Sequence, residues 1–243
     1  EINAQPVTRP GEALEIVPGL IVTQHSGEGK ANQYFLRGFN LDHGTDLAIT
    51  IDGMPVNMRT HGHGQGYADL NFLIPELIGS ALVRKGPYFA MEGDFSSAGA
   101  VRLNLVDGLP KNLAQLTIGS FGYRRALAVA THDVAQGRLL AAVEGALYDG
   151  PWIVLDGTRK LNAVLRYSQG HHDNGFSITG MAYRNRWTST DQIPARAVPT
   201  IGLFGTLDLT DGGNASRLSL STRWSRSDAG SASRIEAYAI RST

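Results

Sequence analysis

The stretch that decides the fold is residues 33–56, QYFLRGFNLDHGTDLAITIDGMPV. A segment of alternating residues opens it, and a polar loop follows over residues 40–46. Apolar residues return at 47–51 and meet the dipeptide Asp52-Gly53. An Asp-Gly pair between two apolar runs predicts a tight β-hairpin, because glycine adopts a positive φ without steric penalty. The stretch by itself therefore predicts a compact α+β unit.

Several short motifs follow one another in a fixed order around this hairpin. They lie at residues 37–38 (Arg-Gly), 51–56 (IDGMPV), 83–87 (VRKGP) and 98–101 (AGAV). In order and spacing they resemble the plug domain of a TonB-dependent outer-membrane receptor, and the resemblance covers residues 13–106. Lys85 stands where the family more often has Arg, and Ala100 stands where it has Gly. The resemblance implies an α+β plug domain followed by strands of a 22-stranded transmembrane β-barrel in the bacterial outer membrane.

Composition limits the function classes. The 22 Lys and Arg residues balance the 22 Asp and Glu residues, so no net field favours nucleic acid and no nucleic-acid partner is expected. Cysteine is absent, which excludes a disulfide framework and thiolate chemistry. No apolar run approaches the roughly 18 residues of a membrane helix. A bilayer-spanning chain of this composition must therefore use antiparallel β-strands, which satisfy their backbone groups in a closed barrel.

The sequence pattern changes after residue 106. Residues 107–112 contain Asp-Gly-Leu-Pro and predict a boundary between a plug domain at 1–106 and barrel strands at 113–243. The second part alternates apolar and polar residues over seven segments of about ten residues, as transmembrane barrel strands do. We expect one apolar face to point to lipid, formed by Leu116, Ile118, Leu139, Ala141, Val143, Leu161, Leu165, Leu218 and Leu220. A soluble antiparallel sheet with one wet face is the alternative interpretation of the same pattern.

The connections between these strands alternate in length. Residues 133–137, 170–175 and 228–231 are short, whereas 149–158 and 188–214 are longer, as at the two rims of an outer-membrane barrel. Seven strands cannot enclose a plug of about 100 residues, because interior width grows with strand number. We therefore expect this chain to be the N-terminal portion of a longer receptor. Within the plug part, a short helix is predicted over residues 70–78.

Four histidines lie in three polar, glycine-containing loops before residue 70. Under the resemblance, these loops point outward and form the floor of the ligand site. The expected ligand-binding residues are His25, Glu28, His43, Arg59, His61, His63, Gln65 and Tyr67. His61, His63 and His43, with Asp42 nearby, offer ligands suited to Ni, Cu or Zn. Arg59 would equally suit an anionic siderophore, and histidines in such loops are usually only hydrogen-bonding residues.

The resemblance implies energised uptake of a scarce ligand, such as a ferric siderophore or another metal chelate. The implied partners are the TonB–ExbB–ExbD energy-coupling complex, an extracellular ligand and outer-membrane lipid. No cofactor is expected apart from a transition-metal ion carried within the transported ligand. The alternatives are a binding or adhesion barrel without transport, and uptake of a vitamin or oligosaccharide by the same architecture. No nucleophile elbow and no placed acid–base pair is present, so no enzymatic activity is expected.

Overall fold

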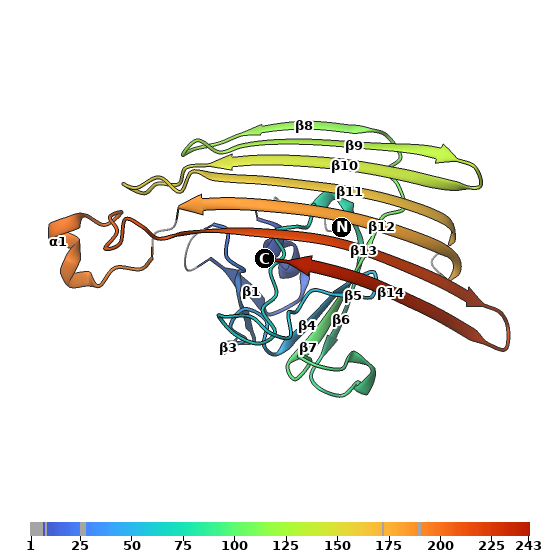
Figure 1. Cartoon of the computed structure of the whole chain (residues 1–243). Helices are drawn as coiled ribbons and strands as arrows, with labels where there is room; N and C mark the ends of the chain where they lie inside the picture. The colour runs from blue at the N-terminus through green and yellow to red at the C-terminus, as the bar shows by residue number, and fades with distance from the viewer. Residues whose placement is uncertain (1–6, 8, 25–27, 172, 189–190) are drawn as a thin grey trace.

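A computed structural model describes residues 7, 9–24, 28–171, 173–188 and 191–243. A broad sheet of long strands arches over a smaller unit that lies against its concave face (Figure 1). The smaller unit is built from the first part of the chain and the broad sheet from the second. No helix among the described residues is long and apolar enough to cross a membrane.

Among its described residues, the smaller unit contains two sheets and three short 3-10 helices. One antiparallel sheet has the order β1-β2-β3, and the other has the order β5-β4-β7-β6, in which β4 and β7 run parallel. The strands are β1 (Leu20–Thr23), β2 (Gln33–Leu36), β3 (Phe39–Asn40), β4 (Leu47–Ile51), β5 (Met54–Pro55), β6 (Ile78–Lys85) and β7 (Gly99–Leu105). The 3-10 helices span Pro10–Ile16, Pro75–Leu77 and Ala90–Glu92.

The predicted hairpin of the opening stretch is confirmed. Asp52 and Gly53 join β4 to β5 with φ angles of 49° and 83°, the positive values that a tight hairpin turn requires at both positions. The side chains of β4 and β7 then face a core whose most buried members include Leu14, Tyr34 and Leu73. The hairpin therefore places its turn at the end of the core sheet, next to the broad sheet.

The helix predicted over residues 70–78 is wrong. Only Pro75–Leu77 forms a single 3-10 turn, and Ile74 before it is extended, with φ −99° and ψ 106°. Proline disfavours the helical conformation in the residue that precedes it and lacks an N–H to continue a helix. Leu70, Leu73 and Ile74 are all buried, so this stretch packs into the core, with a turn in which the Leu73 N–H donates to the Leu70 carbonyl.

The broad sheet contains seven antiparallel strands in chain order among the described residues, as predicted. They are β8 (Leu113–Ile118), β9 (Arg124–Val134), β10 (Gly137–Tyr148), β11 (Thr158–His171), β12 (Asn174–Thr188), β13 (Gly212–Ser227) and β14 (Ala232–Ser242). Helix α1 (Val198–Ile201) lies in the long connection between β12 and β13. β8 and β14 form the two edges, so the sheet is an incomplete barrel. The last element before it, β7, ends at Leu105.

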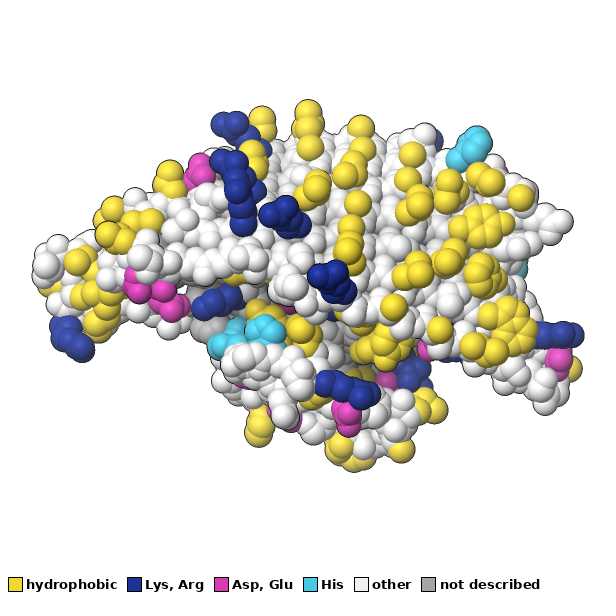
Figure 2. Space-filling view, viewed as in Figure 1, with side chains coloured by type: hydrophobic (Ala, Val, Ile, Leu, Met, Phe, Trp, Pro, Cys, Tyr) yellow, Lys and Arg dark blue, Asp and Glu magenta, His cyan; other side chains and the backbone are white. Residues whose placement is uncertain are grey.

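The two faces of the broad sheet differ in the predicted way. Leu116 and Ile118 are more than four-fifths exposed on the convex face, and the other predicted outward residues are exposed or half-buried there. The neighbours of the predicted outward residues of β11 and β13 point to the smaller unit and are buried or half-buried, including the buried Asn162, Arg166 and Ser219. Rows of hydrophobic side chains cover the convex face in Figure 2. A strand that alternates in this way has one apolar and one polar side.

A buried ion-pair network joins the two parts. Arg166 of β11 is 1% exposed, and its Nη1 lies 2.6 Å from Asp52 Oδ2 in the hairpin turn. The same guanidinium contacts Asp107 at 2.8 Å and donates to Thr179 Oγ1 at 2.8 Å. Arg223 of β13 approaches Asp52 from the other side at 3.4 Å. The hairpin turn therefore serves as a polar contact between the smaller unit and the sheet.

Candidate functional site

The candidate site is formed by two loops of the smaller unit, residues 40–46 and 57–69, which the side chain of Asn57 holds together. Its Oδ1 accepts a hydrogen bond from the Ile49 N–H at 2.7 Å. Its Nδ2 shares two N–H groups among the carbonyls of Gly44 and Leu47, both at 2.9 Å, and Gly66, at 3.0 Å. Asn57 is buried, so these bonds are shielded from water.

Two glycines allow the loops to approach this closely. Gly44 has φ +117° and Gly66 has φ +80°. A Cβ on Gly44 would lie 2.7 Å from the Cβ of Ala68, and a Cβ on Gly66 would lie 3.0 Å from backbone Cα of Thr45. Only glycine fits both the backbone angle and the available space. A backbone hydrogen bond from Ala68 N to His43 O, 2.7 Å long, then ties the loops together.

Three imidazole rings and a phenol ring meet where the loops touch. The His43 and His63 rings lie edge to face, with centroids 4.5 Å apart. The His61 ring stacks on the Tyr67 ring at 3.9 Å and 6°. We call these four residues, His43, His61, His63 and Tyr67, the histidine cluster. Figure 2 shows histidine side chains gathered beneath the sheet, toward the end that carries α1.

Asp42 brings a carboxylate to this cluster. Its Oδ1 lies 3.7 Å from Nε2 of the buried His43. Among the described residues, Asp42, His43 and His63 each offer one ligand atom, and these atoms all lie within 4.8 Å of one another. His43 Nδ1 lies 3.0 Å from the carbonyl of Asn32. Because a carbonyl only accepts, Nδ1 carries the proton and Nε2 faces the carboxylate.

Burial governs ionisation around the cluster. It lowers the pKa of His61, with the neighbouring His63 as a second cause. It raises the pKa of Tyr67 to about 12, and the charge of Asp69 adds to the rise. It also raises the pKa of Asp69 to about 6, against a hydrogen bond from the Asn71 N–H. Near neutral pH these shifts favour a neutral His61 ring and a protonated Tyr67 phenol.

The cluster forms part of the wall of a cavity of ≈ 240 Å³ between the smaller unit and the sheet. Trp187 near the end of β12 and Arg217 of β13 line the opposite wall. The Trp187 Nε1 and Arg217 Nε atoms are buried and have no hydrogen-bond acceptor among the described residues. The cavity therefore combines imidazole acceptors with donors that a ligand could satisfy.

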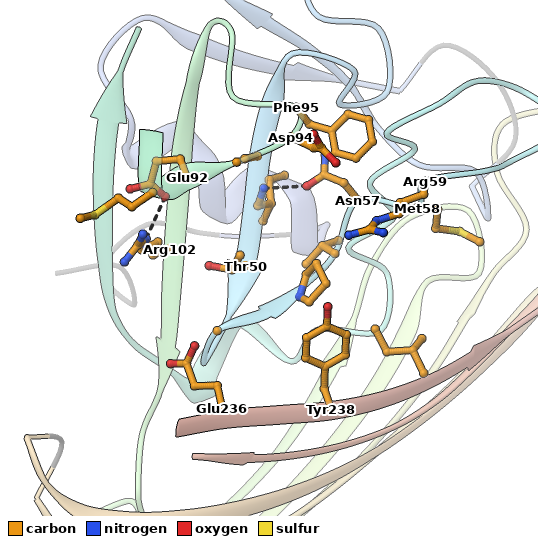
Figure 3. A pocket seen from close by; sticks show the side chains of 18 of the residues that line it. Thr50, Asn57, Met58, Arg59, Glu92, Asp94, Phe95, Arg102, Glu236 and Tyr238 are labelled. Carbon is orange, nitrogen blue, oxygen red and sulfur yellow. Dashed lines mark hydrogen bonds and ion pairs between the residues drawn. The ribbon is translucent and has the colours of Figure 1, made fainter. Parts of the chain in front are cut away.

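A second cavity of ≈ 720 Å³ lies between the core sheet and β14. Figure 3 shows Glu236 and Tyr238 pointing from β14 toward the smaller unit, while Arg59 and Met58 lie across the cavity. Glu92 bonds Arg102 at 2.9 Å on the far wall. The cavity is lined by arginines that outnumber its acidic residues, namely Arg59, Arg102, Arg217, Arg223 and Arg234 against Glu92, Asp94 and Glu236.

The structure separates the residues predicted for the ligand site. His43, His61, His63 and Tyr67 meet in one cluster, while Arg59 lines the larger cavity. Gln65 is exposed on the cluster's own loop. Glu28 lies elsewhere and binds Arg9, with Oε1 and Nη2 2.7 Å apart. His25 lies outside the described residues.

Sequence reasoning missed Asn57 and Asn32. Asn57 follows the hairpin directly, and only its contacts to both loops reveal what it does. Asn32 is 4% exposed, and its carbonyl orients the His43 ring. No local pattern marks either residue, because both act on groups at least eight residues away along the chain.

The cluster lies near the rim that carries the long connections. Trp187 and Gly213 line its cavity, and they flank the connection between β12 and β13 that contains α1. The short turns, residues 135–136 and 228–231 among them, lie at the opposite ends of the strands. If the longer loops face outward, as in outer-membrane barrels, the histidine cluster faces outward too.

Comparison with known proteins gives a consistent family and fold. Residues 1–100 match the family described as TonB-dependent Receptor Plug Domain. The vitamin B12 transporter BtuB of Vibrio vulnificus (strain CMCP6) is 24% identical over 189 residues, covering 74% of this chain and 30% of the relative.

Solved structures agree with this match. Copper transporter OprC aligns with a TM-score of 0.70 at 19% identity, covering 98% of this chain and 35% of that chain. The ferric yersiniabactin uptake receptor FyuA from Yersinia pestis aligns with a TM-score of 0.73 at 15% identity, covering 95% of this chain and 38% of that chain. This chain therefore spans about a third of the length of the relatives it matches.

Proposed function

Because this chain belongs to the TonB-dependent receptors, as a plug domain followed by part of the barrel, we propose that it acts in energised uptake of a scarce ligand. The family consists of bacterial outer-membrane proteins that transport and do not catalyse, in agreement with the absence of catalytic motifs in the sequence. On this assignment the convex face of the broad sheet meets lipid, and the smaller unit is the plug.

The observation that carries the proposal is the histidine cluster on the plug, beside the rim of long connections. A floor for ligand capture must face the outside, offer directional polar groups and stay rigid before binding. The Asn57 bonds and the two close glycines supply the rigidity. The imidazoles, together with the partnerless nitrogens of Trp187 and Arg217, supply the polar groups.

We propose a ferric siderophore or another metal chelate as the ligand class. The relatives named above transport vitamin B12, copper and ferric yersiniabactin by their names, so the architecture accommodates metal-containing cargo. Arg59 and the other arginines of the larger cavity would attract an anionic chelate on its way past the plug. His43, His61, His63, Tyr67, Arg59 and Gln65 remain in the proposed floor.

The proposed partner on the periplasmic side is the TonB–ExbB–ExbD complex. A plug held by buried ion pairs leaves the barrel wall only when work is supplied, because breaking a buried pair leaves uncompensated charges in the interior. Pulling on the plug by an energised inner-membrane complex would supply that work.

Uptake by cells tests the proposal. The receptor that contains this chain is expressed in cells with and without a functional TonB gene. The probes are radiolabelled iron with a hydroxamate or catecholate siderophore, radiolabelled copper, and radiolabelled cyanocobalamin. We expect one probe to accumulate only when TonB is present. Surface binding without accumulation of any probe would instead favour the adhesion or binding barrel.

A further inference from the structure

We propose that Asp42, His43 and His63 form a binding site for a free divalent transition-metal ion, with Cu²⁺ and Zn²⁺ as the fitting cargo. This inference rests on the proposed function, because it assumes that the plug loops hold the ligand before transport. It goes further in naming, beside the chelate proposed above, a free ion that protein side chains hold directly.

The spacing of the donor atoms carries the inference. Metal–nitrogen and metal–oxygen bonds of about 2.0–2.2 Å in a tetrahedral site place neighbouring donors about 3.4 Å apart. His43 Nε2 and Asp42 Oδ1 are 3.7 Å apart, too far for a good hydrogen bond and close to the separation across a shared ion. The His63 donor lies within 4.8 Å of both. A small inward movement of this exposed side chain completes the set.

The groups behind the donors already hold them in position. His43 donates its Nδ1–H to the Asn32 carbonyl, which is the outer contact that orients a metal-binding imidazole and leaves Nε2 for the ion. Asn32 is fixed in turn by its own bond to Gln24 Oε1 at 2.8 Å. Asp42 has φ 49°, and its N–H bonds to Asn40 Oδ1 at 2.8 Å, which directs the carboxylate toward the imidazole.

His61 has a supporting role in this site. Its Nδ1 accepts the backbone N–H of His63 at 3.1 Å, and its ring is stacked on Tyr67. These contacts shape residues 61–63 so that the His63 ring meets the His43 ring. His61 is therefore a positioning residue, and Asp42 replaces it among the ligands.

Three protein ligands leave a coordination position open toward the cavity of ≈ 240 Å³. Structural metal sites are closed by four ligands, whereas open sites exchange their fourth ligand. An open site of two imidazoles and one carboxylate suits cargo that must be released later. Lys30 and Arg217 also line the cavity, so an anionic chelate that binds through them is the competing outcome.

Copper binding by the purified receptor tests the site. Calorimetry with Cu²⁺ and with Zn²⁺ gives affinity and stoichiometry, and electron paramagnetic resonance of the Cu²⁺ form counts the coordinated nitrogens. We expect one ion per chain with two imidazole nitrogens. His63→Ala and Asp42→Asn, both at accessible side chains, should each weaken binding by at least about tenfold.

Two matched variants control for loss of any histidine. His132→Ala and His171→Ala, at exposed positions of β9 and β11, should bind Cu²⁺ as the unmodified protein does. Unchanged affinity in His63→Ala, or a loss in either control as large as in His63→Ala, would overturn the assignment.

The result separates this inference from the proposed function. Copper bound at the site by a receptor that accumulates no probe in cells would overturn uptake and leave the site intact. TonB-dependent accumulation of a ferric chelate that His63→Ala does not change, with no ion bound by the purified receptor, would overturn the site and leave uptake intact.

Discussion

At the scale of single residues, the side chain of Asn57 determines whether the two loops of the proposed ligand floor stay together. Replacing it with Ala would leave the Ile49 N–H and three carbonyls without their partner in a buried place. Each buried group left unsatisfied costs about 1–3 kcal/mol, so we expect Asn57→Ala to destabilise the plug by at least about 3 kcal/mol. Urea unfolding measures the loss of unfolding free energy, and hydrogen exchange at the Ile49 amide shows whether its hydrogen bond is lost.

Gln33→Ala is the control for Asn57→Ala. Gln33 donates to Asn40 Oδ1 at 3.1 Å on the exposed surface. Its loss should change the unfolding free energy by less than about 0.5 kcal/mol. Equal effects of the two variants would show that Asn57 does not hold the loops.

Gly44 and Gly62 give a second residue-scale test. Gly44→Ala places a Cβ 2.7 Å from the Cβ of Ala68 at a φ of +117°, so the loops must separate. A Cβ on Gly62 meets nothing within 4 Å. We expect Gly44→Ala to lower ligand or Cu²⁺ affinity at least about tenfold and Gly62→Ala to leave it within about threefold. The same titration calorimetry measures both, and a loss in Gly62→Ala alone would contradict the loop packing.

The histidines were predictable as a group, but their arrangement was not. Imidazoles in glycine-containing loops stand out in the sequence, and the plug resemblance places those loops on one side. The pairing of His43 with His63, and of His61 with Tyr67, depends on how residues 40–46 pack on residues 57–69. That packing is set by Asn57 and by backbone contacts between loops, which no residue pattern records.

At the scale of elements, the ion pair between the hairpin turn and β11 is the most buried of several polar contacts between plug and barrel. Asp52→Asn keeps the turn residue's size and its tolerance of positive φ. It leaves the buried Arg166 guanidinium with less negative charge beside it. Removing one partner of a buried pair costs about 3–5 kcal/mol. We expect a loss of this size in thermal or urea unfolding of the detergent-solubilised receptor.

The exposed pair Arg138–Asp133 gives the matched control. Its atoms are 3.1 Å apart, and the Asp133 side chain is 81% exposed. Asp133→Asn should alter stability by no more than about 1 kcal/mol, because water screens the charges. A cost for Asp52→Asn as small as this would show that the hairpin turn does not hold the plug to the wall.

The convex face of β13 is tested by a charge at its middle. Leu220 is 53% exposed there and pairs with Gly180 and Ala239 of the neighbouring strands. An Arg on the lipid face near the bilayer midplane costs about 2–4 kcal/mol. Leu220→Arg should therefore reduce the yield of folded receptor in the outer membrane, measured by heat-modifiable mobility of membrane fractions. Leu220→Phe should fold normally, and equal yields of the two variants would place this face in water or protein.

The long strands were predictable because each repeats one alternation over ten or more residues. The helix predicted at residues 70–78 failed because an apolar run with a proline has no clear period, and burial on all sides decided its form. β3 and β5 contain two residues each, too few for any periodic signal. Sequence patterns therefore located the elements whose side chains meet two different environments.

At the scale of the whole molecule, the plug lies on the concave face of an open sheet, and its polar loops lie at one end. This arrangement gives every loop a predicted side of the membrane. By analogy with outer-membrane barrels, the histidine cluster and α1 are predicted to lie on the outer side, and the turns at residues 135–136 and 228–231 on the periplasmic side. The capture of a ligand from outside, which the proposed function requires, depends on this orientation.

Thiol labelling in intact cells tests the orientation most directly, because the chain has no cysteine of its own. Gly62 and Gly230 are both open positions, with nothing within 4 Å of an added Cβ, one beside the histidine cluster and one in the turn between β13 and β14. A membrane-impermeant maleimide should label the Gly62→Cys receptor in intact cells, and the Gly230→Cys receptor only after the outer membrane is opened. Labelling of Gly230→Cys in intact cells while Gly62→Cys stays protected would contradict an outward-facing ligand floor.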